Sequence, residues 1–216
     1  MRRKGCHNKG SFSVSETTWL ITGASSGLGY ALAEHVLQNG ERVVMGARTV
    51  GPMNELASRY PDRGLAVELD VTKPDQRASA VQRCEDHFGS VDVLVNNAAV
   101  DFLGAVEEQD EAAYRATLEV NFFAPVELMR LVLPAMRGRK QGIIVNVSSM
   151  DGIASAPVFG ASALPTGYPR SPARQRLSVA GDETASARHP DHSGAALVVV
   201  NVGSTTTDEE SRHPGH

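Results

Sequence analysis

Between Thr17 and Ser149, short apolar runs alternate with longer stretches of helical period, and this alternation constrains the fold more than any other feature of the sequence. The apolar runs, which we predict as strands, are 17–22, 42–47, 65–69, 91–95 and 142–147. The helical patterns cover 27–39, 52–60, 75–88 and 109–137. This order is typical of an α/β fold, in which a parallel sheet carries helices on both faces.

Composition narrows the classes of protein to consider. A chain of 216 residues with 41% hydrophobic residues can bury one substantial core. With 21 basic and 25 acidic residues the net charge is −4, so neither nucleic acid nor a membrane surface is an expected partner. Cys6 and Cys84 are too few for a disulfide framework or a four-cysteine zinc site. No run of about 18 apolar residues and no signal region is found, so we expect a cytoplasmic protein.

The character of the sequence changes after about Gly160. Residues 161–216 hold five of the eleven prolines, four of the seven histidines and no lysine, and helical periodicity largely disappears. One apolar run, 195–201, interrupts this region, as either a sixth strand or an isolated apolar segment. We expect a disordered tail (1–16), one folded domain (17–160) and a divergent, largely irregular segment (161–216).

A glycine-rich turn joins the first predicted strand to the first predicted helix. It reads TGASSGLG over 22–29, and its candidate ligand-binding residues are Gly23, Ser25, Ser26, Gly27, Leu28 and Gly29. A helix start presents free backbone N–H groups, and glycines let a pyrophosphate approach them closely. The alternative is a strand-to-helix loop with no ligand. No Gly-Lys-Ser/Thr follows, which excludes a P-loop.

Two side chains after the next strands refine this prediction. Arg48 follows the second strand, where a dinucleotide site meets the adenosine ribose, and an arginine there can pair with a 2′-phosphate. Arg48 therefore favours NADP over NAD, the alternative being a solvated surface arginine. Asp70 closes the third strand and can either accept a hydrogen bond from an adenine amino group or cap the helix after Pro74.

Several spaced motifs together resemble the short-chain dehydrogenase/reductase family over about residues 17–160. They are TGASSGLG (22–29), GAR (46–48), LDVT (69–72), VNNAA (95–99), VNFFAP (120–125) and IVNVSSMDG (144–152). The segments 101–108 and 121–137 are most similar to the hydroxysteroid and retinol dehydrogenase branch. The resemblance implies a Rossmann-type, doubly wound sheet that binds NAD(P), and hydride transfer between the nicotinamide and an apolar alcohol or ketone.

The same resemblance assigns roles to individual residues. Asn96 is expected to line the cofactor cleft, Asn121 to hold the water of the proton relay from a helix, and Ser149 to hydrogen-bond the substrate oxygen. Ala99 stands where the family more often has glycine. Relatives commonly pair through their long helices, which leaves a homo-oligomer open for this chain.

The proton-transfer pair of the family is missing. A family tyrosine is expected thirteen positions after Ser149 and a lysine four positions later, but Ser162 and Thr166 stand there. The phenol and its ammonium partner are needed because the substrate oxygen becomes alkoxide-like during hydride transfer. Tyr168, the nearest tyrosine, has prolines at 169 and 172, which disfavour the regular helix that would aim it into the cleft.

The divergence of the C-terminal part leads to a hypothesis about its origin. Codons for residues 182–193, read one base later, permit family-like sequence, so we hypothesise a reading-frame shift near residue 160. We therefore expect the sheet to be incomplete at its C-terminal side. Three functions stay open for the chain: a short-chain oxidoreductase of doubtful turnover, a nucleotide-binding pseudoenzyme or a non-functional fragment.

The histidines of 189–192 lie in a proline-containing stretch typical of a solvated loop, so we predict no metal.

Overall fold

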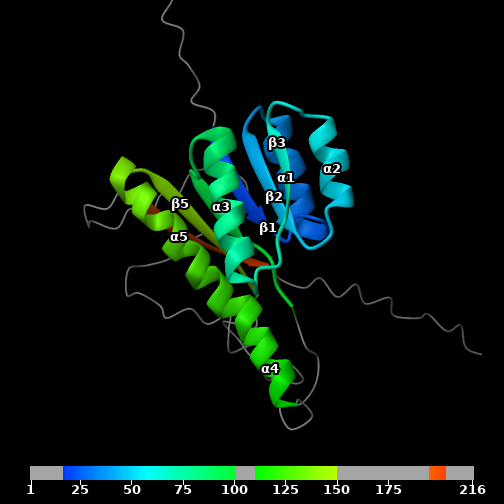
Figure 1. Ribbon diagram of the computed structural model, residues 1–216, viewed down its shortest axis with the longest axis vertical. Helices are drawn as coiled ribbons and strands as arrows, with labels where there is room; N and C mark the ends of the chain where they lie inside the picture. Colours follow the sequence, from blue (N-terminus) through cyan, green and yellow to red (C-terminus); the bar gives the residue numbers. More distant parts are fainter. Residues whose placement is uncertain (1–16, 101–109, 150–194, 203–216) are drawn as a thin grey trace, which may run out of the picture.

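A computed structural model describes residues 17–100, 110–149 and 195–202, which form a parallel sheet flanked by helices (Figure 1). The strand order is β3-β2-β1-β4-β5-β6. The strands are β1 (Thr18–Thr22), β2 (Arg42–Ala47), β3 (Gly64–Glu68), β4 (Val93–Asn96), β5 (Gly142–Ser149) and β6 (Ala195–Val202). The predicted α/β, Rossmann-type doubly wound sheet is confirmed.

The apolar run near residue 195 is a strand. β6 pairs in parallel with β5 over the whole of its length, from Gly142 opposite Ala195 to Ser149 opposite Val202. Of the two alternatives for this run, the structure therefore has the sixth strand. The predicted tail at 1–16 and the rest of the divergent segment lie outside the described residues.

Helices connect the strands on both faces of the sheet. They are α1 (Gly27–Gln38), α2 (Gly51–Ser58), α3 (Pro74–Phe88), α4 (Glu111–Leu118) and α5 (Ala124–Arg139). Gly40 lies two residues after the end of α1 and Gly89 directly after the end of α3, and both have a positive φ, as expected for the left-handed residue that terminates a helix. Among the described residues, the helices are all too short or too polar to cross a membrane.

The helix predicted over 109–137 differs in its middle. A π-helical turn, η2 (Glu119–Phe123), joins α4 to α5. A π turn inserts one residue into the helical ladder, which rotates the side chains that follow, and the apolar period of the sequence does not reveal such a local change. Asn121 lies in the middle of this turn.

The sheet separates two apolar layers, because alternate strand residues point to opposite faces. One layer packs Ile21, Val43 and Val95 against α1 and α2. The other packs Leu20, Val44, Leu94 and Ile144 against α3 and α5. From β1 the chain runs outward through β2 to β3, and α3 then returns it to β4 on the opposite side of β1. The carboxyl ends of β1 and β4 are therefore a topological switch point, where open α/β sheets bind ligands.

Candidate functional site

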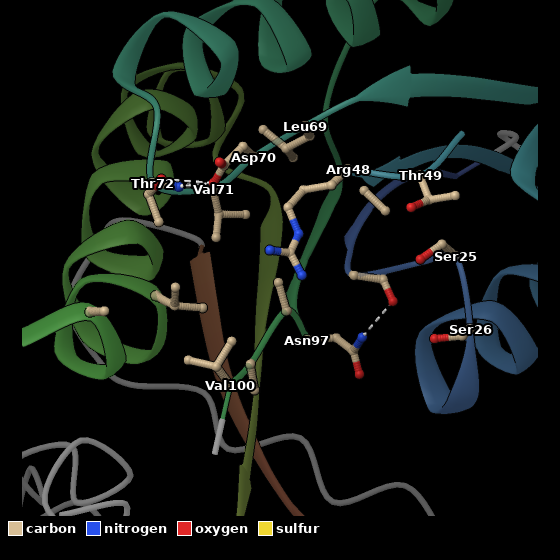
Figure 2. Close-up of a pocket in the computed structure, with 16 residues that line it drawn as sticks. Ser25, Ser26, Arg48, Thr49, Leu69, Asp70, Val71, Thr72, Asn97 and Val100 are labelled. Carbon is tan, nitrogen blue, oxygen red and sulfur yellow. Dashed lines mark hydrogen bonds between the residues drawn. The ribbon is translucent and has the colours of Figure 1, made fainter. Parts of the chain in front are cut away.

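A cavity of about 600 Å³ lies at this carboxyl edge of the sheet (Figure 2). Its walls come from five parts of the chain, each of which follows a strand or lies on the helix after β4. They are Gly23 with Ser25 and Ser26, residues 47–49, 69–72 and 97–100, and the pair Ala116 and Val120. Four segments that are far apart in the sequence thus line one cavity together with residues of α4 and η2.

The glycine turn after β1 forms one wall through close backbone approaches. Gly23 has φ +67°, and a Cβ there would lie 2.8 Å from the Ala98 Cα. A Cβ at Gly29 would lie 2.5 Å from the Gly23 carbonyl oxygen and would also strike the Asn97 amide. Side chains at these positions would push the turn away from the loop after β4. Packing alone therefore requires glycine at positions 23 and 29.

The N-terminus of α1 faces the cavity behind this turn. Ser25 and Ser26 line the cavity, whereas residues 27–29 form the first turn of α1, with Leu28 48% exposed and Gly29 buried. Ser26 makes no capping hydrogen bond, and the first turn of α1 carries no acidic residue. The free N–H groups and the positive end of the helix dipole are thus available to an anion such as a pyrophosphate.

Asn97 and Thr22 connect the first turn to the loop after β4. Thr22 Oγ1 accepts hydrogen bonds from the backbone N–H groups of Asn97 and Ala98, both at 3.0 Å, and donates to the Val95 carbonyl at 3.3 Å. Neither residue was predicted as a site residue from the sequence. The signal was weak, because a buried threonine at a strand end and the second asparagine of VNNAA have many structural uses.

Asn96 lies inside the sheet, outside the wall of this cavity. It is 4% exposed, and its Nδ2 donates to Asn146 Oδ1 on the neighbouring strand at 2.7 Å. Asn97, the next residue, lines the cavity instead. Successive side chains of an extended segment point to opposite sides, so the motif brings only one of its two amides to the cavity. Asn96 Oδ1 and Asn146 Nδ2 are buried without a hydrogen-bond partner.

Arg48 and Asp70 are brought together by the ends of β2 and β3. Both line the cavity, and the exposed Arg48 side chain extends into it (Figure 2). Asp70 Oδ1 accepts hydrogen bonds from the Thr72 N–H at 3.0 Å and the Thr72 hydroxyl at 2.8 Å. These bonds lower the pKa of Asp70, and the positive charges of Lys73 and Arg48 act in the same direction. The Asp70 side chain therefore caps the turn 70–72. It does not cap α3, whose N-cap residue is Lys73.

Asn121 is anchored to the loop after β4. Its Oδ1 accepts from the Val100 N–H at 3.0 Å, and its Nδ2 donates to the Val100 carbonyl at 2.7 Å. Val100 lines the cavity, so Asn121 holds one of its walls from the π turn. Ser149 ends β5, the strand next to β4. Ser162, Thr166 and Tyr168 lie outside the described residues.

The described side chains offer ligands for an organic anion rather than a metal. Within 17–100, 110–149 and 195–202, no three histidine, cysteine, aspartate or glutamate side chains come together as a metal would need. The cavity combines N–H groups at a helix start, an arginine, an ionised carboxylate and apolar side chains. A long molecule with phosphates in its middle and a flat ring at each end matches this distribution.

Comparisons with known proteins agree with this geometry. The family model described as short chain dehydrogenase matches residues 17–163. Oxidoreductase BOA17 of Botryotinia fuckeliana is 35% identical over 88% of this chain, and dehydrogenase/reductase SDR family member 7B of Bos taurus is 37% identical over 69% of it. The chain spans 66% of the first relative and 49% of the second.

A solved structure supports the same assignment. The crystal structure of a short-chain dehydrogenase from Streptomyces avermitilis superimposes with a TM-score of 0.69 at 40% identity. The match covers 72% of this chain and 57% of that one. On its motifs, its sheet and its relatives, this chain belongs to the short-chain dehydrogenase family.

Proposed function

We propose that the cavity binds NADP(H), with the pyrophosphate at the α1 N-terminus and the 2′-phosphate at Arg48. The observation that carries the proposal is the uncapped, acid-free start of α1 behind a turn in which Gly23 has no room for a side chain. A pyrophosphate satisfies those N–H groups. Arg48 can donate two parallel hydrogen bonds to a phosphate, which NADP carries on this ribose and NAD lacks.

The far end of the cavity suits an adenine ring. Leu69 and Val71 supply apolar surface there, and Asp70 supplies an acceptor for an amino group. An aspartate carboxyl is ionised at neutral pH, the hydrogen bonds from Thr72 lower the pKa of Asp70 further, and an ionised carboxylate only accepts hydrogen bonds. Adenine, which presents an amino group on a flat ring, satisfies both features.

By family, the activity proposed for the site is hydride transfer between the cofactor and an apolar alcohol or ketone. The nicotinamide supplies or receives the hydride when the cofactor is bound. Ser149 hydrogen-bonds the substrate oxygen, and Asn121 holds the water of the proton relay beside Val100. The two Val100 hydrogen bonds fix the Asn121 side chain, so the π turn orients this part of the site. We further propose a cytoplasmic protein acting on a small molecule, with self-association through its long helices left open.

A second candidate is nucleotide binding without turnover. Ser162 and Thr166 occupy the positions of the family's tyrosine and lysine, and no tyrosine of this chain is followed four residues later by a lysine. A serine hydroxyl is a much weaker acid than a phenol and does not replace it as a proton donor near neutral pH. The cofactor site is independent of that pair, so binding is expected to persist where turnover is lost.

Two titrations test these alternatives. NADPH fluorescence is followed as protein is added, and saturable binding that NADP⁺ competes away supports the cofactor site. The absence of saturation indicates a non-functional fragment and rejects the proposal. A panel of apolar ketones is then added, and ketone-dependent loss of NADPH absorbance separates an enzyme from a binding protein. Matched assays with NADH test the preference for the 2′-phosphate.

A further inference from the structure

The guanidinium of Arg77 lies buried between two walls of the cavity. Arg77 belongs to the first turns of α3 and is 5% exposed. Its Nη1 donates to the Val71 carbonyl oxygen at 2.5 Å and lies 3.8 Å from Glu119 Oε1. Val71 lines the cavity on the proposed adenine side, and Glu119 begins the π turn η2. One side chain therefore contacts both the turn after β3 and the helix that carries Asn121.

Stability does not account for a charge at this position. The Arg77 Nε is buried without a hydrogen-bond partner, and burying an incompletely paired guanidinium is unfavourable. The partner carboxylate of Glu119 is 42% exposed, and at 3.8 Å the pair is long, so water screens much of their attraction. An unbranched apolar side chain of similar length would fill the same space without the desolvation cost.

The contacts of Arg77 instead favour a role in holding the turn after β3 and the π turn η2 at a fixed distance from each other. Gln76 Oε1 accepts the Asp70 N–H at 2.6 Å, so α3 already holds the turn after β3 at one point. Arg77 adds a second point at Val71 and extends the connection to Glu119, next to the cavity residue Val120. Two residues beyond Glu119 stands Asn121, which fixes Val100. A movement of η2 would thus shift the turn after β3, on the proposed adenine side, and the Asn121 side chain at the same time.

We infer that Arg77 is a positioning residue that holds the adenine side of the cavity and the Asn121 turn at a fixed separation. This inference rests on the proposed cofactor site but concerns a residue outside the cavity wall. Because Arg77 acts through Val71 and Glu119, its loss should weaken binding of the nucleotide without removing any group that contacts it. A residue needed only for folding would affect the melting temperature and leave the affinity unchanged.

The test compares R77M and R77K with R130M. Arg130 is an exposed arginine on α5 paired with Glu127, so R130M is a matched control. We expect R77M to lower Tm, because the Val71 carbonyl loses its donor, and also to raise the NADPH Kd about tenfold, a change about as large as the worth of one hydrogen bond. R77K should show a smaller increase, and R130M none. In combination with E119Q, the loss from R77M should be less than additive. An unchanged Kd in both Arg77 variants would overturn the inference.

Hydrogen exchange of the protein without nucleotide gives a second readout. R77M should accelerate exchange at both 70–72 and 119–123, whereas R130M should alter neither segment. Acceleration at one segment alone, or at neither, contradicts a link between them. This readout also separates the two proposals, because it does not require NADPH binding. Failure of the wild-type chain to bind NADPH would reject the cofactor site, and the exchange pattern would still decide the role of Arg77.

Discussion

Asn97 is bound to Thr22 in two ways. Its backbone N–H donates to the Thr22 hydroxyl at 3.0 Å, and its side-chain Nδ2 donates to the Thr22 carbonyl at 2.9 Å. The same Nδ2 lies 3.3 Å from the Gly23 carbonyl. Thr22 is 1% exposed, so these bonds are shielded from water. The ends of β1 and β4 are therefore joined at the switch point, and the glycine turn has a fixed position relative to the loop after β4.

Replacing Thr22 tests this connection. T22V keeps the shape of the side chain but leaves the Asn97 and Ala98 N–H groups without their acceptor. We expect the free energy of unfolding to fall by about 1–3 kcal/mol, the cost of unpaired buried polar groups. Chemical denaturation monitored by circular dichroism measures it. T22S retains the hydroxyl and removes only the methyl group, so it should lose less than T22V. A loss in T22V no larger than that in T22S would contradict the role given to the hydroxyl.

Gly29 tests the close packing behind the turn. In G29A the new methyl group would meet the Gly23 carbonyl and the Asn97 amide, so we expect a loss of about 1–3 kcal/mol in unfolding free energy and weaker NADPH binding. G138A is the control, since a Cβ at Gly138 on α5 meets nothing within 4 Å. That variant should be neutral or more stable by up to about 1 kcal/mol. Full stability of G29A would contradict the packing found here.

Arg48 tests the preference between the two cofactors. R48E removes the proposed phosphate partner and adds a like charge, so the NADPH Kd should rise about tenfold to a hundredfold. The NADH Kd should change little or fall, because a carboxylate there can accept from a ribose hydroxyl. Fluorescence titrations with both cofactors measure the ratio. R130E, on the exposed face of α5, controls for the change in net charge and should leave the ratio unchanged.

Protonation of Asp70, on the proposed adenine side, makes the free energy of unfolding depend on pH. Hydrogen bonds from Thr72 lower the pKa of this carboxyl below its value in the unfolded chain, so its contribution to stability is complete above the unfolded pKa. The contribution is lost as pH falls through the lower, folded value. The difference in unfolding free energy between wild type and D70A should be constant near neutral pH and shrink in acid. A difference that grows as the pH falls would contradict this.

Cys84 is predicted to be chemically inert in the folded chain. Burial raises the pKa of its thiol from near 9 to about 12, so the reactive thiolate is scarce at pH 8. In a C6S background, iodoacetamide should modify Cys84 only after denaturant is added, which mass spectrometry detects. The raised pKa also means that stability declines as pH rises from about 9 toward 12. Rapid modification under native conditions would show that α3 opens readily.

Much of the fold could be predicted from local pattern. Each of the five predicted strands overlaps an observed one. The glycine turn, Arg48 and Asp70 were recognised because their positions follow strand ends. Asn97 and Arg77 were not recognised. An asparagine beside another asparagine and an arginine within an amphipathic helix have ordinary surface uses, and only their neighbours in space distinguish them. The π turn at Asn121 likewise leaves no mark on the apolar period.

The sequence by itself determined the order of strands and helices and the glycine positions, because apolar period and backbone freedom are properties of neighbouring residues. Tertiary structure decided which amide of the 96–97 pair reaches the cavity, that Arg48 lies near enough to Asp70 to help lower its pKa, and that 195–202 pairs with β5 as a sixth strand. Each of these depends on contacts between residues far apart in the chain. Such contacts arise only when the sheet brings its carboxyl ends to one edge.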